Sequence, residues 1–307
     1  MATQEGPGEI SVEEVGNYTI ARTRLLDARA SMAYAAGIND TNPAYFDDLR
    51  SEGLKVHPAI AFSLQWNARF MPDQQINLRA APFGVHAETD LRIHRPFRSG
   101  EAVTTQGRLV ARRQIGPGVY SVDRYRMTGS NGDLIAELDY NGIIRGGVLA
   151  GKAVVLEADV ARPEPTAAQA EPLWSDAVHV PLHAGQQYTE CADIYNPIHT
   201  EPSAARKGGL PGVILHGSAT KAMALSAVIK HCFDGNPDRV TRLVGQLRGM
   251  VLMDTTISID CLAIEDHGDE RRVFFRVLNQ EGQAAIAGGL VCGQVCGQVC
   301  GQVCGQV

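Results

Sequence analysis

The chain has 307 residues and is 44% hydrophobic, which is enough for two ordinary domains or for one domain built from two halves. Its 28 basic and 34 acidic residues are well mixed and give a net charge of −6, so no basic block indicates a nucleic-acid partner or an anionic membrane surface. The chain contains no run of eighteen apolar residues, and we expect no membrane span.

The two ends of the chain give an expectation about its location. Residues 1–6 are neither a secretory signal nor a basic presequence, and residues 305–307 are not a peroxisomal Ser-Lys-Leu signal. We therefore expect an intracellular, cytoplasmic protein, with peroxisomal and mitochondrial locations left open.

The seven cysteines do not form a metal-binding or disulfide pattern. Cys191, Cys232 and Cys261 are isolated, and the other four lie in a C-terminal repeat with no histidine nearby. No C-x-x-C pair occurs, and no G-x-G-x-x-G segment follows a strand and opens a helix. We therefore expect no disulfide framework, no metal and no bound redox cofactor.

Four landmarks recur in the same order at offsets of 150 to 159 positions, which indicates a diverged duplication. The paired residues are Asn42 and Asn196, His57 and His216, Arg95 and Arg248, and Gly132 and Gly282. The predicted organisation is an N-terminal half over residues 1–150, a linker over 151–172, a C-terminal half over 173–292 and a tail over 293–307.

Each half is predicted to combine a helix with an antiparallel meander, an α+β unit. The Ala- and Ser-rich segment 217–230 has helical spacing and suits close wrapping by a sheet. Asn131-Gly132 is a strong hairpin signal, and Glu281-Gly282 occupies the equivalent place. The expected strands, which alternate with period two, span residues 102–110, 120–127, 256–262 and 273–278.

Two segments carry little core-forming composition. Residues 161–172 contain three prolines and read as a semi-extended linker. The tail repeats Val-Cys-Gly-Gln four times from Val291 to Gln306. We expect its first copy to complete the last strand and the rest to be an extension without an assigned function.

Chemically useful residues concentrate between Asp193 and His199. Pro197 fixes φ and cannot continue a helix, and Asn196 can hold the resulting bend, so the turn can fold the two side chains toward each other. A water between the carboxylate and the imidazole can lose a proton to one group while it attacks an electrophilic carbon, and the other group can protonate the product.

Structural explanations compete with this chemical one. Asp193 and Asn196 are also good helix-capping residues, and His199 can be a satisfied, partly buried histidine. His216-Gly217 precedes the Ala-rich helix, whose first N–H groups favour negative charge, so Gly217 can let a carbonyl oxygen approach closely. His216 itself can be only a cap or a packing residue.

Residues 188–199, followed by 214–217, resemble the hydratase motif of the MaoC-like dehydratases, the type-2 (R)-specific enoyl-CoA hydratases. Residues 95–101 are similar to a strand-start motif of the same family. The resemblance covers residues 15–292 and implies a double hot-dog fold, in which each half wraps a long central helix in an antiparallel sheet. It also implies reversible hydration of a trans-2-enoyl-CoA to an (R)-3-hydroxyacyl-CoA, with coenzyme A as part of the substrate.

The resemblance assigns roles residue by residue. The family's water-activating pair maps to Asp193 and His199, and the Asn that orients them maps to Asn196. The glycine that contacts the thioester carbonyl maps to Gly217. The residues assigned to substrate binding are Gly217, His216 and Tyr195.

Neither half matches the family order Asp-x-Asn-Pro-x-His in full. Asp193 stands six positions before His199 rather than five, and Ile194 occupies the expected Asp position. The first half keeps Asp40 and the Asn-Pro turn but has Tyr45 in place of the histidine, so we interpret it as a decayed site that helps form the acyl tunnel. In the second half, a local adjustment restores Asp193, or catalysis rests mainly on His199, or the site is inactive or altered.

Two other functions compete with hydration. Hot-dog folds also host thioesterases, and a non-catalytic acyl-CoA-binding protein has the same outline. A duplicated chain reproduces within itself the dimer of single-domain relatives, so a monomer and a homodimer both fit, and we expect a homodimer.

Overall fold

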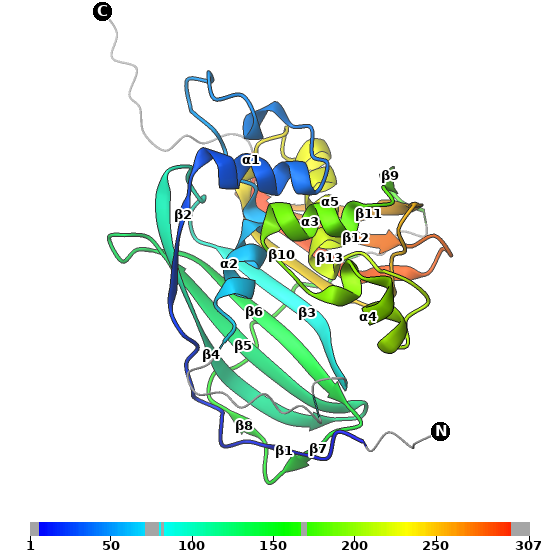
Figure 1. Cartoon of the computed structure of the whole chain (residues 1–307). Helices are drawn as coiled ribbons and strands as arrows, with labels where there is room; N and C mark the ends of the chain where they lie inside the picture. The colour runs from blue at the N-terminus through cyan, green and yellow to red at the C-terminus, as the bar shows by residue number, and fades with distance from the viewer. Residues whose placement is uncertain (1–5, 71–79, 81–82, 167–170, 296–307) are drawn as a thin grey trace, which may run out of the picture.

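One antiparallel sheet of eleven strands runs through the molecule, with the helices gathered on one side of it (Figure 1). The computed structural model describes residues 6–70, 80, 83–166 and 171–295. In their order across the sheet, the strands of the first half are β2 (Arg22–Leu26), β4 (Glu101–Ile115), β5 (Gly118–Thr128), β6 (Leu134–Arg145) and β3 (Gly84–Ile93).

The second half has the equivalent strands in the reverse order across the sheet. Continuing from β3, its strands are β10 (Val240–Leu247), β13 (Ala284–Gln294), β12 (Glu270–Leu278), β11 (Thr255–His267) and β9 (Trp174–Val180). All four strands expected from the sequence lie within β4, β5, β11 and β12. The two halves of the sheet join where β3 pairs with β10, and this seam places Leu91 opposite Leu243.

The second half wraps its sheet around α5 (Gly217–Cys232), the helix expected at residues 217–230. Eleven of its sixteen residues are buried, as a helix enclosed by a sheet requires, and small side chains allow the close approach. The expected long central helix of the first half is much shorter, because α2 (Ala61–Asn67) follows the 3-10 turn η2 (Pro58–Ile60) and ends after two turns. The α+β double hot-dog prediction is otherwise confirmed.

Two further helices hold the halves together on the helical side of the sheet. α1 (Ala28–Gly37) packs against α3 (Ala184–Ala192), and a Cβ atom on Gly37 would lie only 2.7 Å from Cys191 Cβ. The hydroxyl groups of Tyr34 and Tyr188 hydrogen bond at 3.1 Å across this contact. Further short helices among the described residues are η1 (Pro43–Tyr45), η4 (Pro197–His199), α4 (Pro202–Lys207) and η5 (Pro237–Arg239).

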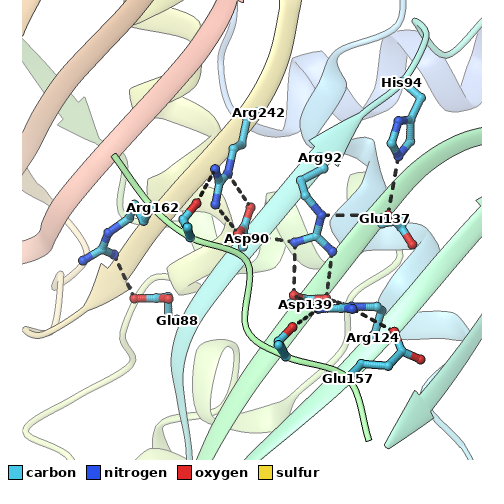
Figure 2. A network of polar contacts seen from close by, with 12 residues as sticks. Glu88, Asp90, Arg92, His94, Arg124, Glu137, Asp139, Glu157, Arg162 and Arg242 are labelled. Atoms are coloured by element: carbon cyan, nitrogen blue, oxygen red, sulfur yellow. Dashed lines mark hydrogen bonds and ion pairs between the residues drawn. The ribbon is translucent and has the colours of Figure 1, made fainter. Parts of the chain in front are cut away.

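The sheet face turned away from the core carries a network of ion pairs, shown in Figure 2. Asp90 and Arg242 pair at 2.7 Å across the seam between the halves. Asp139 lies between two guanidinium groups, with Arg92 at 3.0 Å and Arg124 at 2.7 Å. Side chains alternate along β3, so Leu91 faces the core while these charges face outward.

The predicted linker lies against this charged face. Arg124 donates to Glu157 at 2.8 Å, and Arg162 pairs with Glu88 at 3.0 Å. The linker also holds strand β8, while β1 and β7 form a separate two-stranded sheet. The bounds of these short strands are Glu9–Ser11 for β1, Val148–Ala150 for β7 and Val154–Val155 for β8. None of the helices in the described residues has the length and apolar character needed to cross a bilayer.

The first copy of the C-terminal repeat completes the last strand, as expected. Residues 291–294 form the end of β13, and the Val295 amide donates to the Asp269 carbonyl at 2.9 Å. The rest of the repetitive tail, residues 296–307, lies outside the described residues, as do linker residues 167–170.

Candidate active site

A cavity of about 1020 Å³, here called the first cavity, lies where the two halves meet. The first half contributes residues of α2, β3 and β6 to its lining, including Phe62 and Tyr140. The second half contributes part of segment 194–217, the start of α5 and the end of β10. The cavity therefore combines a wall of apolar, aromatic and polar side chains from one half with the sequence motif of the other.

His199 has a fixed tautomer. The Asn-Pro turn forms as expected, because the Asn196 side chain accepts from the Ile198 amide at 3.5 Å and η4 brings His199 to the cavity. His199 Nδ1 lies 2.8 Å from the Ile214 carbonyl oxygen, which can only accept, so Nδ1 carries the proton and Nε2 is an acceptor. Burial lowers the pKa of His199 to about 4, so the ring is neutral at neutral pH.

His216 supports the His199 ring. The two imidazoles stack with centroids 3.8 Å apart, and His216 is 2% exposed. His216 Nε2 donates to the Ile194 carbonyl at 3.1 Å, so this tautomer is also fixed by the backbone. Burial, with a smaller contribution from His199, lowers the pKa of His216 to about 2 and keeps it neutral.

The N-terminus of α5 opens into the same cavity. Gly217 and Ser218, the first two residues of this helix, line the cavity. The first N–H groups of a helix have no intrahelical partner and favour a developing negative charge. A Cβ atom on Gly217 would lie 2.4 Å from Leu247 Cδ1, so glycine keeps Leu247 close to the helix start.

Among the described residues, Asp193 makes no hydrogen bond or ion pair with His199, the partner expected for it. Asp193 is the left-handed C-cap of α3, with φ 57°, and its side chain is 65% exposed. Its carboxylate accepts from Asn67 Nδ2 at 3.1 Å and lies 3.8 Å from Arg24, outside the residues that line the first cavity. Asp193, which stands one position too early for the motif, thus ends helix α3. Ile194, at the position where the family has its aspartate, is buried.

Tyr195 also lies away from the first cavity. Its ring is 56% exposed, and its hydroxyl donates to Glu201 Oε1 at 2.5 Å. Its assignment to substrate binding therefore has no support in the arrangement of the lining residues. The expected site residues that the structure does bring together around the first cavity are Asn196, His199, His216 and Gly217.

We expect Asp193→Asn to change enoyl-CoA hydration, where it is measured, by less than about twofold. The exposed pair with Arg24 contributes little, about 0–1 kcal/mol, and asparagine tolerates the left-handed conformation that this position requires. Steady-state kinetics and thermal unfolding of the variant check both statements. A loss of a hundredfold or more with an intact fold would return Asp193 to the catalytic site.

The first half keeps the other part of the family pattern, in a different cavity. Asp40 and Asn42 line a second cavity of about 560 Å³. Where the second half has Gly217, the first half has Pro58, which has no N–H, and the next amide, of Ala59, donates to His57 Nδ1 at 3.2 Å. The family's aspartate and histidine positions are therefore filled in two separate cavities, with Asp40 in one and His199 in the other.

The sequence reasoning missed a polar group in the wall of the first cavity. Thr89 and His86 of β3 line the cavity, and the fully buried Lys221 of α5 donates to Thr89 at 2.7 Å. The available signal was a lysine four residues after Gly217 in an otherwise apolar stretch of helix. Among the described residues, no cluster of three or more His, Cys, Asp or Glu side chains is arranged to hold a metal ion.

Comparison with solved structures identifies the fold class. A MaoC-like dehydratase from Phytophthora capsici superimposes with a TM-score of 0.79 at 19% identity, covering 93% of this chain and 99% of that one. A Mycobacterium tuberculosis protein described as a double hotdog fold gives a TM-score of 0.61 at 12% identity, covering 92% and 96%. The chain is therefore a double hot-dog protein.

Sequence comparison matches a family model in each half. Residues 175–281 match the MaoC like domain, and residues 14–138 match the FAS1-like, dehydratase domain region. The second half therefore carries a MaoC-like dehydratase domain and the first half a FAS1-like dehydratase region, which makes the chain a hydro-lyase enzyme.

A sequence relative of known activity matches only part of the chain. The peroxisomal enoyl-CoA hydratase 2 of Arabidopsis thaliana is 30% identical over 97 residues, which are 32% of this chain. The chain spans 30% of the length of that hydratase.

Proposed function

We propose that the protein hydrates a trans-2-enoyl-CoA reversibly to a 3-hydroxyacyl-CoA in the first cavity. The observation that carries this proposal is the position of His199, neutral and with Nε2 as an acceptor, beside the free N–H groups of the α5 N-terminus. The MaoC-like domain and the partial match to an enoyl-CoA hydratase support the same reaction and an acyl-CoA substrate.

One residue can perform both proton transfers. His199 Nε2 takes a proton from water while the water oxygen bonds to C3 and the C2–C3 π electrons move toward the thioester oxygen. N–H groups at the start of α5 stabilise the enolate. The imidazolium then returns the proton to C2 and the carbonyl re-forms, so one molecule of water has been added. Because the same ring removes and returns the proton, both new bonds form on one face of the substrate.

Within the part of the chain that the structure describes, no carboxylate pairs with His199, which fits this scheme. An imidazole with a low pKa is a weak base, but its protonated form is a strong acid toward C2. Asn196 lines the cavity and contributes an amide that can orient the water. We therefore assign catalysis to His199 and water orientation to Asn196.

Hydration can be followed as loss of the enoyl-thioester absorbance, with crotonyl-CoA and longer trans-2-enoyl-CoA substrates. The competing thioesterase function releases free coenzyme A, which a thiol reagent detects. A non-catalytic acyl-CoA-binding protein would bind these compounds without turning any of them over. Thiol release from saturated acyl-CoA, or no turnover at any chain length, would contradict the proposal.

We expect Gly217→Ala to lower kcat/KM for hydration by about 10- to 100-fold, because the added methyl group pushes Leu247 into the space where the thioester carbonyl must sit. Alanine favours the helix, so the melting temperature should not fall. Thermal unfolding and kinetics together check the prediction. Unchanged kinetics would mean that the carbonyl does not bind at the start of α5.

The proposal also includes an oligomeric state and a cellular location. We propose a homodimer, which sedimentation of the purified chain can distinguish from a monomer. We also propose an intracellular location, which fractionation of cells can test.

A further inference from the structure

A cluster of hydrogen-bond donors lies at the first cavity, apart from His199: Thr89 and His86 are in the cavity wall, and Lys221 is buried behind them. Lys221 Nζ donates to Thr89 Oγ1 at 2.7 Å, and His86 Nε2 lies 2.7 Å from the same oxygen. Lys221 is 0% exposed and Thr89 is 1% exposed, while Thr89 and His86 line the cavity. The cluster joins α5 of one half to β3 of the other.

The hydrogen atoms of this cluster outnumber its acceptors. His86 Nε2 also lies 3.1 Å from the Glu88 carbonyl oxygen, which can only accept, so Nε2 carries a proton. Thr89 Oγ1 therefore accepts from both Lys221 and His86, and its own O–H has no acceptor within the cluster. Lys221 likewise has further N–H groups and, among the described residues, no second hydrogen-bond partner.

Lys221 has no carboxylate to neutralise it. Glu88, the acid whose charge acts on Lys221, pairs with Arg162 at 3.0 Å on the outer side. Burial lowers the pKa of Lys221 to about 7, although the charge of Glu88 opposes the shift. Buried polar groups without partners are costly, so a ligand atom that accepts hydrogen bonds here gains more than it would in water.

The cluster is placed to meet an acyl chain rather than the thioester. Lys221 is four residues after Gly217, one turn along α5, which is about 6 Å from the proposed carbonyl position. The cavity lining includes apolar and aromatic side chains such as Phe62 and Leu138, and the Tyr140 ring is stacked on His86 with centroids 4.1 Å apart. A chain running along this wall passes the cluster several carbon atoms beyond the reacting double bond.

We propose that the preferred substrate has an oxygen acceptor on its acyl chain, to which the Thr89 hydroxyl donates while the buried Lys221 donates to Thr89 from behind. This inference rests on the proposed function, because it takes the first cavity as the acyl-CoA site. The shared chemistry is a hydroxyl, keto or carboxylate oxygen beyond the double bond. A plain alkyl chain leaves the donors of the cluster unsatisfied.

Binding of saturated acyl-CoAs tests this inference without any turnover. Dissociation constants are measured by calorimetry for hexanoyl-CoA, 6-hydroxyhexanoyl-CoA and adipoyl-CoA, and for the corresponding three eight-carbon compounds. We expect an oxygen-bearing chain of one length to bind about tenfold or more tightly than its alkyl counterpart. The hydroxyl and carboxylate arms distinguish a neutral from an anionic acceptor. Equal or tighter binding of the alkyl chain at both lengths would overturn the inference.

Substitutions locate the preference. Lys221→Met keeps the length of the side chain and should lower the oxygen-to-alkyl affinity ratio, because Thr89 loses the donor that polarises its hydroxyl. Thr89→Val, which keeps the shape of threonine, should lower the same ratio and serves if the first variant does not fold. Lys230→Met is the matched control, since Lys230 lies on the same helix, has a 68% exposed side chain and pairs with Asp176. An unchanged ratio in both cluster variants would overturn the assignment.

The two proposals fail in different ways. An oxygen preference without hydration of any enoyl-CoA would sink the proposed reaction and leave the binding cluster standing. Hydration with no oxygen preference would keep the reaction and remove the cluster from substrate recognition.

Discussion

Replacing His199 by asparagine is expected to lower kcat/KM for enoyl-CoA hydration by about 10²- to 10⁴-fold, the usual contribution of a general acid–base group. The asparagine Nδ2 can take over the hydrogen bond that His199 Nδ1 donates to the Ile214 carbonyl. The substitution therefore removes the proton-accepting Nε2 and keeps the local contact. Initial rates with a trans-2-enoyl-CoA, together with the melting temperature, measure the effect.

His183→Asn is the matched control for this variant. His183 is an exposed histidine of the same half, at the start of α3, and its side chain makes no capping hydrogen bond. It should retain the wild-type rate. Full activity of His199→Asn would remove His199 from the mechanism, and equal losses in the two variants would point to a general effect on the protein.

The pH dependence of hydration should report the same group. Only the neutral ring can accept a proton, and burial lowers the pKa of His199 to about 4. The rate in the wild type should therefore be present above this value and fall as the pH drops through it. A fall that begins near the ordinary histidine pKa of about 6.5 would show that another group controls the reaction.

Much of the fold follows from local pattern in this sequence. Small residues at helical spacing predict the buried helix α5. The alternation of apolar and polar residues predicts the strands, and the same alternation is seen in their burial in the sheet. The short α2 was not predicted, because the landmarks that reveal the duplication do not fix the length of the helix between them. Pro58, aligned with Gly217, was the signal that the first half differs at this point.

The site was predictable only in part, for a reason of backbone geometry. The Asn-Pro turn and His199 follow from residues next to one another, and the structure places them as expected. The direction of Asp193 depends on how α3 ends, and the left-handed conformation at that residue turns its side chain toward Asn67 and Arg24. The cluster around Lys221 forms only when β3 and α5, from different halves, are packed together.

Asp139→Ala is expected to lower the free energy of unfolding by about 1.5 to 3 kcal/mol, because it removes the carboxylate that two half-buried guanidinium groups share, while Arg92 keeps Asp90 and Arg124 keeps Glu157. The side chain of Asp139 is 5% exposed and accepts four hydrogen bonds, two from Arg92 and two from Arg124, at 2.7 to 3.0 Å. Arg92, Arg124 and Asp139 lie on the neighbouring strands β3, β5 and β6, so the substitution removes side-chain bonds that link three strands of the first-half sheet (Figure 2). Urea unfolding measures it.

Asp159→Ala is the control on the same charged face. Asp159 is 52% exposed and pairs with Arg113 at 2.6 Å, so its loss should cost less than about 1 kcal/mol. Burial alone would raise the pKa of Asp139, but hydrogen bonds from Arg124 and Arg92 outweigh it and hold the pKa below its ordinary value. Its contribution should therefore be complete above the unfolded value of about 3.9 and be lost as the pH falls through the lower folded pKa. Equal stability losses in the two variants would mean that the buried network adds no more than an exposed ion pair.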